Sequence, residues 1–266
     1  MKNNNLPIGV FDSGVGGLTV LSKLNAALPQ ENFIYFGDTA HVPYGNKSKE
    51  TIEKYCLNIV RFLNAQKAKL IIIACNTASA IALKTIQENT DIPVLNVIDP
   101  CIEVAVNNTK TNHIGVIGTK TTISSQAYVE KIHAINKNIF VYSKECPLFV
   151  PIIEESLSNH SIANIAAKLY LKKIPKEVDT LILGCTHYPL IKKTIQNSIS
   201  SKTSILDSSI VVAEYVKEYM VKNSLLNSGF LKGENSFYIS DDVEKFENSI
   251  ANIMNVFNCK VKKVDL

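Results

Sequence analysis

The sequence predicts an α/β fold of two pseudo-symmetric lobes, each with a mostly parallel sheet, and a ligand site in the cleft between them. Two observations carry this prediction. Short apolar runs alternate with longer amphipathic ones, which is typical of a parallel sheet with helices on both faces. Two of the apolar runs also recur later in the chain at nearly one offset, which indicates an internal duplication.

Composition agrees with a globular protein of this size. The chain has 266 residues, 46% of them hydrophobic and 20% charged, so it is too apolar for a disordered chain. The length accommodates one large domain or two of ordinary size. The net charge of +4 is mild, and Arg61 is the single arginine. Direct nucleic-acid binding is therefore disfavoured, because base recognition draws on the bidentate arginine fork.

The N-terminal residues run directly into a strand-like segment, without the apolar core and cleavage site of a signal peptide. The longest apolar stretch, residues 70–75, is far shorter than the roughly 18 residues that a membrane span needs. We therefore expect a cytoplasmic protein with no membrane association. In that compartment its six cysteines stay reduced.

The elements of the first lobe follow in order. Leucines at 18, 21, 24 and 28 have the spacing of one helix face, and Ser48 suits the N-cap of a second helix with apolar positions from 52 to 63. Apolar runs predict four strands, at residues 8–11, 33–36, 70–74 and 94–97.

The second lobe repeats this plan. Residues 113–119 echo residues 7–13 at an offset of 106, from position 8 to position 114. Residues 180–187 echo residues 71–77 at an offset of 110, from position 75 to position 185. Each repeat contains an apolar strand, and in the second pair that strand ends in a cysteine, Cys75 in the first lobe and Cys185 in the second.

We expect the first lobe to comprise residues 1–97 together with a C-terminal tail, residues 208–266, and the second lobe to comprise residues 98–207. The tail is too small to stand alone, so it should pack back on the first lobe. Its pattern predicts, in order, a helix at 210–221, a bend at 227–235, a strand at 237–239, a helix at 243–257 and a strand at 260–264.

Two cysteines occupy matching positions. Cys75 and Cys185 each follow a predicted strand, at the sheet edge where α/β proteins bind ligands. Residues typical of a helix start come next, so the helix dipole should lower the pKa of each thiol below about 8.5. The backbone N–H groups at such a start also hold carboxylates.

The other cysteines lack such a context. Cys56 and Cys101 suit small buried hydrophobes, and Cys146 and Cys259 have no partner that suggests a role. A zinc site is a weak interpretation because no C-x-x-C pair exists, and we expect no metal. A redox disulfide between the two matched cysteines is an alternative, although it too lacks that motif.

Two ionisable residues accompany the matched cysteines. His187 lies two residues after one thiol and could promote thiolate formation there, although a lone histidine is more often structural. Asp12 ends the first strand and could serve the other thiol, or could simply cap a helix. Gly14, Gly16 and Gly17 lack phosphate-loop spacing, so a tight turn close to a small ligand is the better interpretation.

At this point the sequence resembles the bacterial glutamate racemases. The matching blocks occur in family order along most of the chain, and two of them contain the matched cysteines. They are residues 9–20 (GVFDSGVGGLTV), 35–38 (YFGD), 43–45 (PYG), 74–80 (ACNTASA), 149–151 (FVP) with Glu154, and 184–190 (GCTHYPL).

The resemblance implies interconversion of L- and D-glutamate without a cofactor, to supply D-glutamate for peptidoglycan, by a homodimeric enzyme. It implies that Cys75 deprotonates D-glutamate while Cys185 reprotonates it, with the roles exchanged for L-glutamate. Asp12 would assist the first thiol and His187 the second, with Glu154 nearby. DNA gyrase, bound by some family members as a side role, is a further partner that the resemblance raises.

The resemblance also implies a set of substrate contacts. A base alone cannot make the α-proton acidic enough, so hydrogen-bond donors must stabilise the charge that develops on the α-carboxylate as the carbanion forms. We expect Asn76, Thr77 and Thr186 to supply them. Ser13, Tyr44 and Gly45 would hold the side-chain carboxylate. Pro43 is an expected neighbour of the substrate, as are Asp12 and His187.

Three residues depart from the family pattern without touching the cysteine blocks. His41 stands where the family often has arginine, Cys101 where a small residue is usual, and Asp241 where glycine is expected. Two rival functions remain open. One is racemisation of aspartate or another amino acid by a related two-cysteine enzyme, and the other is a binding protein without activity on the same fold.

Overall fold

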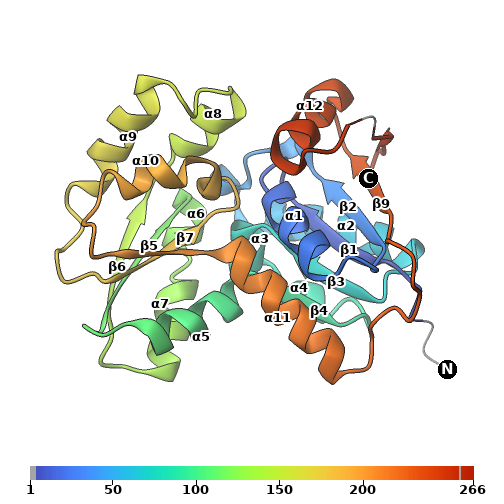
Figure 1. Cartoon of the computed structure of the whole chain (residues 1–266), viewed down its shortest axis with the longest axis horizontal. Coiled ribbons are helices and arrows are strands. Elements are labelled where there is room, and N and C mark those ends of the chain that lie inside the picture. Colours follow the sequence, from blue (N-terminus) through green and yellow to red (C-terminus); the bar gives the residue numbers. More distant parts are fainter. Residues whose placement is uncertain (1–3, 258) are drawn as a thin grey trace.

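The computed structural model describes residues 4–257 and 259–266, and it consists of two α/β lobes side by side (Figure 1). The strands are β1 (Ile8–Asp12), β2 (Phe33–Gly37), β3 (Leu70–Ile73), β4 (Val94–Asn96), β5 (His113–Gly118), β6 (Phe140–Glu145), β7 (Thr180–Gly184), β8 (Ser204–Asp207), β9 (Asn235–Ile239) and β10 (Val261–Lys263).

Helices of varied length connect these strands. The α-helices are α1 (Leu18–Ala27), α2 (Lys49–Ala65), α3 (Asn76–Ile81), α4 (Leu83–Gln87), α5 (Ile98–Asn108), α6 (Lys120–Ser124), α7 (Ala127–Ile135), α8 (Phe149–Glu154), α9 (Ser161–Leu171), α10 (Lys192–Gln196), α11 (Ser208–Lys222) and α12 (Val243–Met254). Three 3₁₀ segments complete the set, at η1 (Thr39–His41), η2 (Tyr44–Asn46) and η3 (Tyr188–Ile191).

The two sheets share one strand plan. The first has the order β10-β9-β2-β1-β3-β4 and the second β6-β5-β7-β8, with parallel pairing throughout. Ile8 pairs with Leu70 across β1 and β3, and Ile114 pairs with Thr180 across β5 and β7. These are the partners that the two sequence offsets relate, so the duplication extends to strand register.

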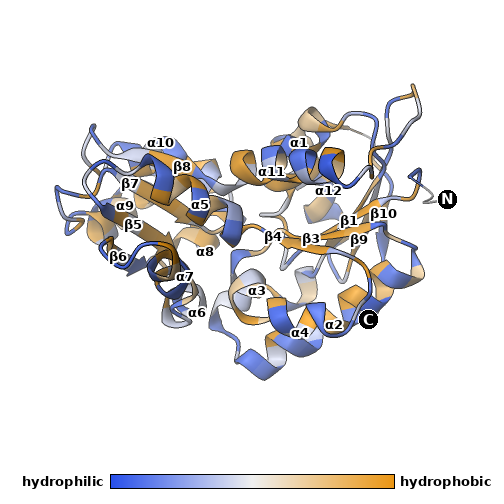
Figure 2. Ribbon diagram, turned by 90° about the horizontal axis from the view of Figure 1, so that it is seen from below, coloured by the Kyte–Doolittle hydropathy of each residue, from blue (hydrophilic) through white to orange (hydrophobic). Residues whose placement is uncertain are grey.

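The central strands β1, β3 and β7 are buried on both faces, as their continuous apolar runs predicted. Val10 packs into one core cluster of the first lobe, whereas Phe11, which points to the opposite face, packs into another. Val116 and Ile117 divide in the same way in the second lobe. The apolar colouring is concentrated along the strands in both lobes, while the surrounding helices present hydrophilic positions (Figure 2).

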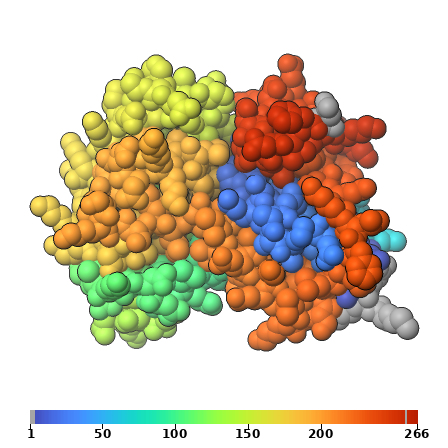
Figure 3. Space-filling view, in the orientation of Figure 1, coloured from blue at the N-terminus to red at the C-terminus, as the bar shows by residue number. Residues whose placement is uncertain are grey.

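The C-terminal tail completes the first lobe. β9 pairs with β2 at the edge of the first sheet, and α12 carries buried Phe246 and Ile250 into the same core as α1. The space-filling view shows α12, in red, beside α1 in blue and facing the second lobe (Figure 3). α12 is shorter than predicted and ends at Met254. The lobe boundaries after residues 97 and 207 stay a prediction.

Local signals explain where the site's elements begin. Ser48 is the N-cap of α2, as predicted, and its hydroxyl accepts a hydrogen bond from the Thr51 N–H.

Within the described part of the chain, no helix has the length and apolar character needed to cross a bilayer.

Candidate active site

The candidate site lies between the lobes, where the carboxyl ends of β1, β3 and β7 meet. Both matched thiols border one cavity of about 10 Å³, which is room for about one water molecule. Its wall consists of Ser13, Val42, Pro43, Tyr44, Gly45, Cys75, Asn76, Thr77, Thr119, Val150, Cys185, Thr186 and His187. The wall includes every sequence-predicted site residue except Asp12 and Glu154, which lie behind it as partners of Thr186 and His187.

Cys75 is the N-cap of the short helix α3. Its Sγ accepts a hydrogen bond from the Ala78 N–H at 3.5 Å and lies 3.7 Å from the Ser13 Oγ. The predicted fall in the pKa of this thiol is wrong. Burial above all, and then the negative charge of Asp12, raise the pKa of Cys75 to about 12. A six-residue helix and one N–H bond offset only part of the desolvation.

Cys185 has a charged partner instead. Its Sγ lies 3.8 Å from Nδ1 of His187, and Nε2 of the same ring lies 2.7 Å from Oε1 of Glu154. Burial lowers the pKa of His187, but hydrogen bonds and charges from Cys185 and Glu154 outweigh it and raise that pKa to about 10. His187 is therefore an imidazolium at neutral pH, with one N–H directed at the sulfur and the other at the carboxylate.

Glu154 ends α8 and keeps its negative charge. Burial raises the pKa of its carboxyl group, but the hydrogen bond and charge of His187 and the cation of Lys245 lower it below the usual value. The segment that carries His187 is also rigidly held, since the Tyr188 hydroxyl donates to the Cys146 carbonyl at 3.0 Å. The first helical segment after Cys185 is the 3₁₀ segment η3, which begins at Tyr188, and not the predicted α-helix start.

Asp12 is completely buried at the end of β1. Its carboxylate accepts hydrogen bonds from the Gly14 N–H at 3.0 Å and from the Thr186 hydroxyl at 3.2 Å, so it joins the two lobes. Burial raises its pKa, and the charge of His187 lowers it in part. α1 begins only at Leu18, with Gly17 as its N-cap, so Asp12 is not a helix cap.

The glycine-rich turn brings backbone close to protein groups. A Cβ on Gly16 would lie 2.4 Å from both Nδ1 of His187 and Oγ1 of Thr186, and a Cβ on Gly17 would lie 2.5 Å from Cβ of Asp12. The turn is tight, as predicted, but what Gly16 approaches is the second lobe and not the expected small ligand.

The predicted α-carboxylate donors are already organised by contacts across the cleft. The Asn76 amide donates to the Tyr128 hydroxyl at 2.9 Å, and its own carbonyl oxygen is buried without a hydrogen-bond partner. The Thr77 hydroxyl lies 3.0 Å from those of both Thr119 and Thr122. An unpartnered acceptor in the cavity wall suits a ligand that brings a donor.

The η2 segment forms the opposite wall. The Tyr44 hydroxyl donates its proton to Asp38 at 2.6 Å, and Pro43 and Gly45 line the cavity beside Tyr44. A Cβ on Gly45 would lie 2.5 Å from Cβ of Thr119, so only glycine allows the lobes to approach here.

Sequence reasoning missed several groups of the site. Thr119 is the partner of Ser13 at the offset of 106, so the duplication could have identified it. Val42 and Val150 line the cavity, and Tyr128 holds Asn76, through contacts between segments that no local pattern marks.

The remaining cysteines and the departures from the family pattern lie outside the cavity wall. All six cysteines are free, and Cys56, Cys101 and Cys146 are buried in apolar clusters. His41 lies 2.8 Å from the Asp38 carboxylate, and Asp241 pairs with a lysine on the surface. Across residues 4–257 and 259–266, no three His, Cys, Asp or Glu side chains gather as metal ligands.

These features define a class of enzyme. Two thiols at equivalent strand ends of duplicated lobes line one small cavity, and an ionisable side chain accompanies each. Such a site provides acid–base chemistry on two opposite sides of a small substrate.

Comparison with known proteins places the chain within that class. The model of the Asp/Glu/hydantoin racemase family matches residues 8–216. The glutamate racemase of Geobacter metallireducens is 46% identical over 235 residues, which cover 88% of this chain and 87% of that protein. The chain belongs to the Asp/Glu/hydantoin racemase family and, within it, to the glutamate racemases.

Solved structures agree. The glutamate racemase of Francisella tularensis, crystallised with D-glutamate, superimposes with a TM-score of 0.92 at 41% identity, covering 98% of each chain. Isoform RacE1 of the Bacillus anthracis glutamate racemase gives a TM-score of 0.95 at 34% identity over 99% of each chain.

Proposed function

We propose that the chain interconverts L- and D-glutamate with Cys75 and Cys185 as bases on opposite faces of the α-carbon. The observation that carries this proposal is the shared cavity: two pseudo-equivalent thiols, one from each lobe, line its wall. Inversion at carbon requires removal of a proton from one face and delivery of another to the opposite face. Two fixed bases achieve this without turning the substrate over. The D-glutamate formed would supply peptidoglycan synthesis.

The contacts of Cys185 support its proposed role as the base that acts on L-glutamate. The His187 imidazolium beside Sγ stabilises negative charge on the sulfur, and Glu154 holds the ring in place. We infer that this thiolate takes the α-proton from L-glutamate. The C–H electron pair stays on carbon as the carbanion, and the proton becomes the new S–H.

The Cys75 half is set up as the acid. Its raised pKa of about 12 keeps the sulfur protonated at neutral pH, so it can deliver its proton to the opposite face of the carbanion. For D-glutamate the two protonation states must exchange. The positive ammonium group of a substrate beside Asp12 would neutralise the charge that opposes a Cys75 thiolate, which gives Asp12 its assisting role.

The remaining wall groups are proposed to hold the substrate. The Thr77 hydroxyl and the Thr186 backbone N–H would donate hydrogen bonds to the α-carboxylate, where charge develops in the transition state, and the free Asn76 carbonyl would accept from the ammonium group. Ser13, Gly45 and the backbone of Tyr44 and Pro43 would hold the side-chain carboxylate. Because the cavity holds about one water molecule, the lobes must separate to admit glutamate.

The first prediction concerns the two thiols. Cys75→Ser and Cys185→Ser should each lower racemisation by roughly 10³-fold or more, because a serine hydroxyl is a far weaker acid than a thiol. Circular dichroism with each glutamate enantiomer measures the loss, and Cys101→Ser, outside the cavity, is the matched control. Full activity in both single variants would contradict the two-thiol mechanism. Turnover of aspartate alone would establish the rival substrate, and turnover of neither would favour a binding protein.

Isotope effects assign each thiol to a direction. Enantiomers have equal free energies, so kcat/KM must be the same in both directions for every variant. The primary isotope effect is free of that constraint, since each α-deuterated enantiomer reports on the thiol that abstracts from it. A change confined to α-deuterated L-glutamate identifies the Cys185 half, and one confined to the D-enantiomer identifies the Cys75 half.

Three further expectations stay predictions from the resemblance: a homodimer, a cytoplasmic location and a side role with DNA gyrase. Sedimentation of the purified chain tests the first directly.

A further inference from the structure

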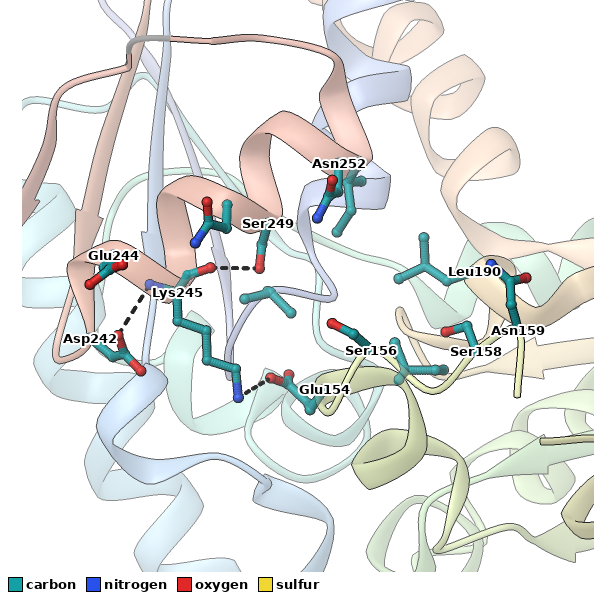
Figure 4. A pocket seen from close by; sticks show the side chains of 14 residues that line it. Glu154, Ser156, Ser158, Asn159, Leu190, Asp242, Glu244, Lys245, Ser249 and Asn252 are labelled. Atoms are coloured by element: carbon teal, nitrogen blue, oxygen red, sulfur yellow. Dashed lines mark hydrogen bonds and ion pairs between the residues drawn. The ribbon is translucent and has the colours of Figure 1, made fainter. Parts of the chain in front are cut away.

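Lys245 extends from the C-terminal helix of one lobe to the active-site relay of the other. α12 is anchored on the first lobe by the buried side chain of Phe246, and Asp242 caps its first turn by accepting from the Lys245 N–H at 3.1 Å. The lysine side chain leaves this fixed start and places Nζ 3.6 Å from Oε2 of Glu154 (Figure 4).

Glu154 connects this cation to the thiol. One carboxylate oxygen faces Lys245, and the other lies 2.7 Å from the His187 ring that contacts Cys185. The Glu154 side chain is only 12% exposed, so its charge is costly to maintain without partners. The chain of contacts therefore runs from α12 of the first lobe through α8 to the sulfur of the second.

Lys245 lies among negatively charged side chains. Glu155, Asp242 and Glu244 add negative charge around the same groove of about 600 Å³, and all but the first of these line it. Among the described residues that line this groove, Lys245 is the one cation. The other charged partner of Glu154 is His187, on the side of the catalytic cavity.

We propose that Lys245 is a positioning residue for the Cys185 half of the site: it keeps Glu154 ionised and directed at His187 when the lobes are closed. It touches neither thiol, and its action rests on the proposed function. Because its partner belongs to the opposite lobe, separation of the lobes would break the ion pair. Closure around substrate would then complete the charge arrangement beside Cys185 at the moment of reaction.

Lys245→Met tests this proposal. The Lys245 side chain is about half exposed, so kcat/KM should fall only about two- to five-fold. The acidic limb of the pH profile of kcat/KM should move to higher pH, because Glu154 loses a cation that lowers its pKa. The isotope effect should grow for α-deuterated L-glutamate and not for the D-enantiomer. Lys245→Arg should restore all three quantities.

Glu155→Gln is the matched control. It removes the second ion pair of Lys245, at 3.8 Å and on the exposed side, and leaves Glu154 in place, so none of these quantities should change. If Glu155→Gln reproduces the effect of Lys245→Met, or if Lys245→Met has no effect on the pH limb and isotope effect, the proposal is wrong. Lys245→Gln answers the same question should the methionine variant unfold at a lower temperature.

A Glu154→Gln background separates this inference from the proposed function. In that background Lys245→Met should have no additional effect on the pH limb, since the lysine acts through the lost charge. An undiminished effect would overturn the inference alone. Full activity of Glu154→Gln itself would instead overturn the role of Glu154, on which the inference depends.

Discussion

The Cys75 and Cys185 halves of the site share a scaffold but differ in chemistry. Cys75 follows β3 and Cys185 follows β7, which are equivalent strands of the two sheets and pair in the same register with β1 and β5. Cys75 faces the Ser13 hydroxyl with the negative charge of Asp12 nearby, whereas Cys185 faces the imidazolium of His187. The difference teaches that duplication supplied the two-sided geometry, while the charged residues near each sulfur differ between the lobes.

This asymmetry is what a two-base reaction needs. One sulfur must be a thiolate while the other is a thiol. Identical environments would give both sulfurs the same pKa and would therefore favour the same protonation state in both. The surroundings of the two sulfurs differ in this structure, since burial and the charge of Asp12 raise the pKa of Cys75 to about 12, whereas Cys185 lies 3.8 Å from Nδ1 of His187.

After the loss of the thiols themselves, the largest expected effect comes from exchanging their ionisable partners for neutral residues. His187→Asn and Asp12→Asn should each lower kcat/KM by about 10²- to 10³-fold, the range typical of lost acid–base assistance. The two variants should diverge in isotope effect. His187→Asn should raise it for α-deuterated L-glutamate, and Asp12→Asn for α-deuterated D-glutamate.

His133→Asn controls for loss of an imidazole from the same lobe, where His133 contacts the Ile139 carbonyl. It should leave both isotope effects at the wild-type value. Identical isotope patterns in the two site variants would contradict the assignment of one partner to each half.

Much of this comparison was accessible from the sequence. The strand runs, the two offsets and the paired cysteines predicted the duplicated fold and the thiols, because buried parallel strands leave continuous apolar signals. The electrostatics were not accessible in the same way. Proximity of Cys75 to a helix start predicted a lowered pKa, but desolvation depends on how the second lobe covers the sulfur, which local sequence does not encode.

The cross-lobe contacts were also hidden. Lys245 lies in a tail helix 91 positions after Glu154, and nothing in either segment marks the other as a partner. Thr119 is different, because its match to Ser13 was present in the repeat. A duplication thus identifies equivalent positions in the two lobes, whereas contacts between the lobes require the folded chain.

Gly16→Ala should damage the contact that brings the halves together. The added methyl would lie 2.4 Å from the ring of His187 and from Oγ1 of Thr186, so one lobe must shift. We expect about 1–3 kcal/mol of destabilisation from overpacking, and roughly a tenfold or greater loss of kcat/KM from the misplaced ring. Chemical denaturation measures the loss of stability, and the circular dichroism assay measures the loss of kcat/KM.

Gly14→Ala is the control. Its added Cβ would come no nearer than 3.2 Å to a neighbouring atom, so it should have the smaller effect. Equal effects would show that the close approach is unimportant.

The pH dependence of stability should separate the halves by window. The folded pKa of His187 is raised from 6.5 to about 10, so its stabilising contribution is complete below pH 6.5 and is lost as the pH rises through 10. The folded pKa of Cys75 is raised from 9.0 to about 12, so its stabilising contribution is complete below pH 9 and is lost as the pH rises from 9 to 12. Unfolding free energies between pH 6.5 and 9 should therefore flatten in His187→Asn but not in Cys75→Ser. A flattened curve in the cysteine variant would contradict this order.

The smallest expected effect tests the threonine cluster that joins the lobes. Thr122→Val preserves shape but removes a hydroxyl that lies 3.0 Å from those of Thr77 and Thr119. Because Thr122 is buried, we expect a loss of about 1–2 kcal/mol in unfolding free energy. Thr121→Val, which loses one half-buried bond to the Gly45 carbonyl, should cost less. Neither hydroxyl touches a thiol, so kcat/KM should change less than it does in Gly16→Ala. A larger catalytic loss in Thr122→Val would mean that the cluster sets the thiol geometry, and that the lobe contact, more than the residues beside each sulfur, controls the site.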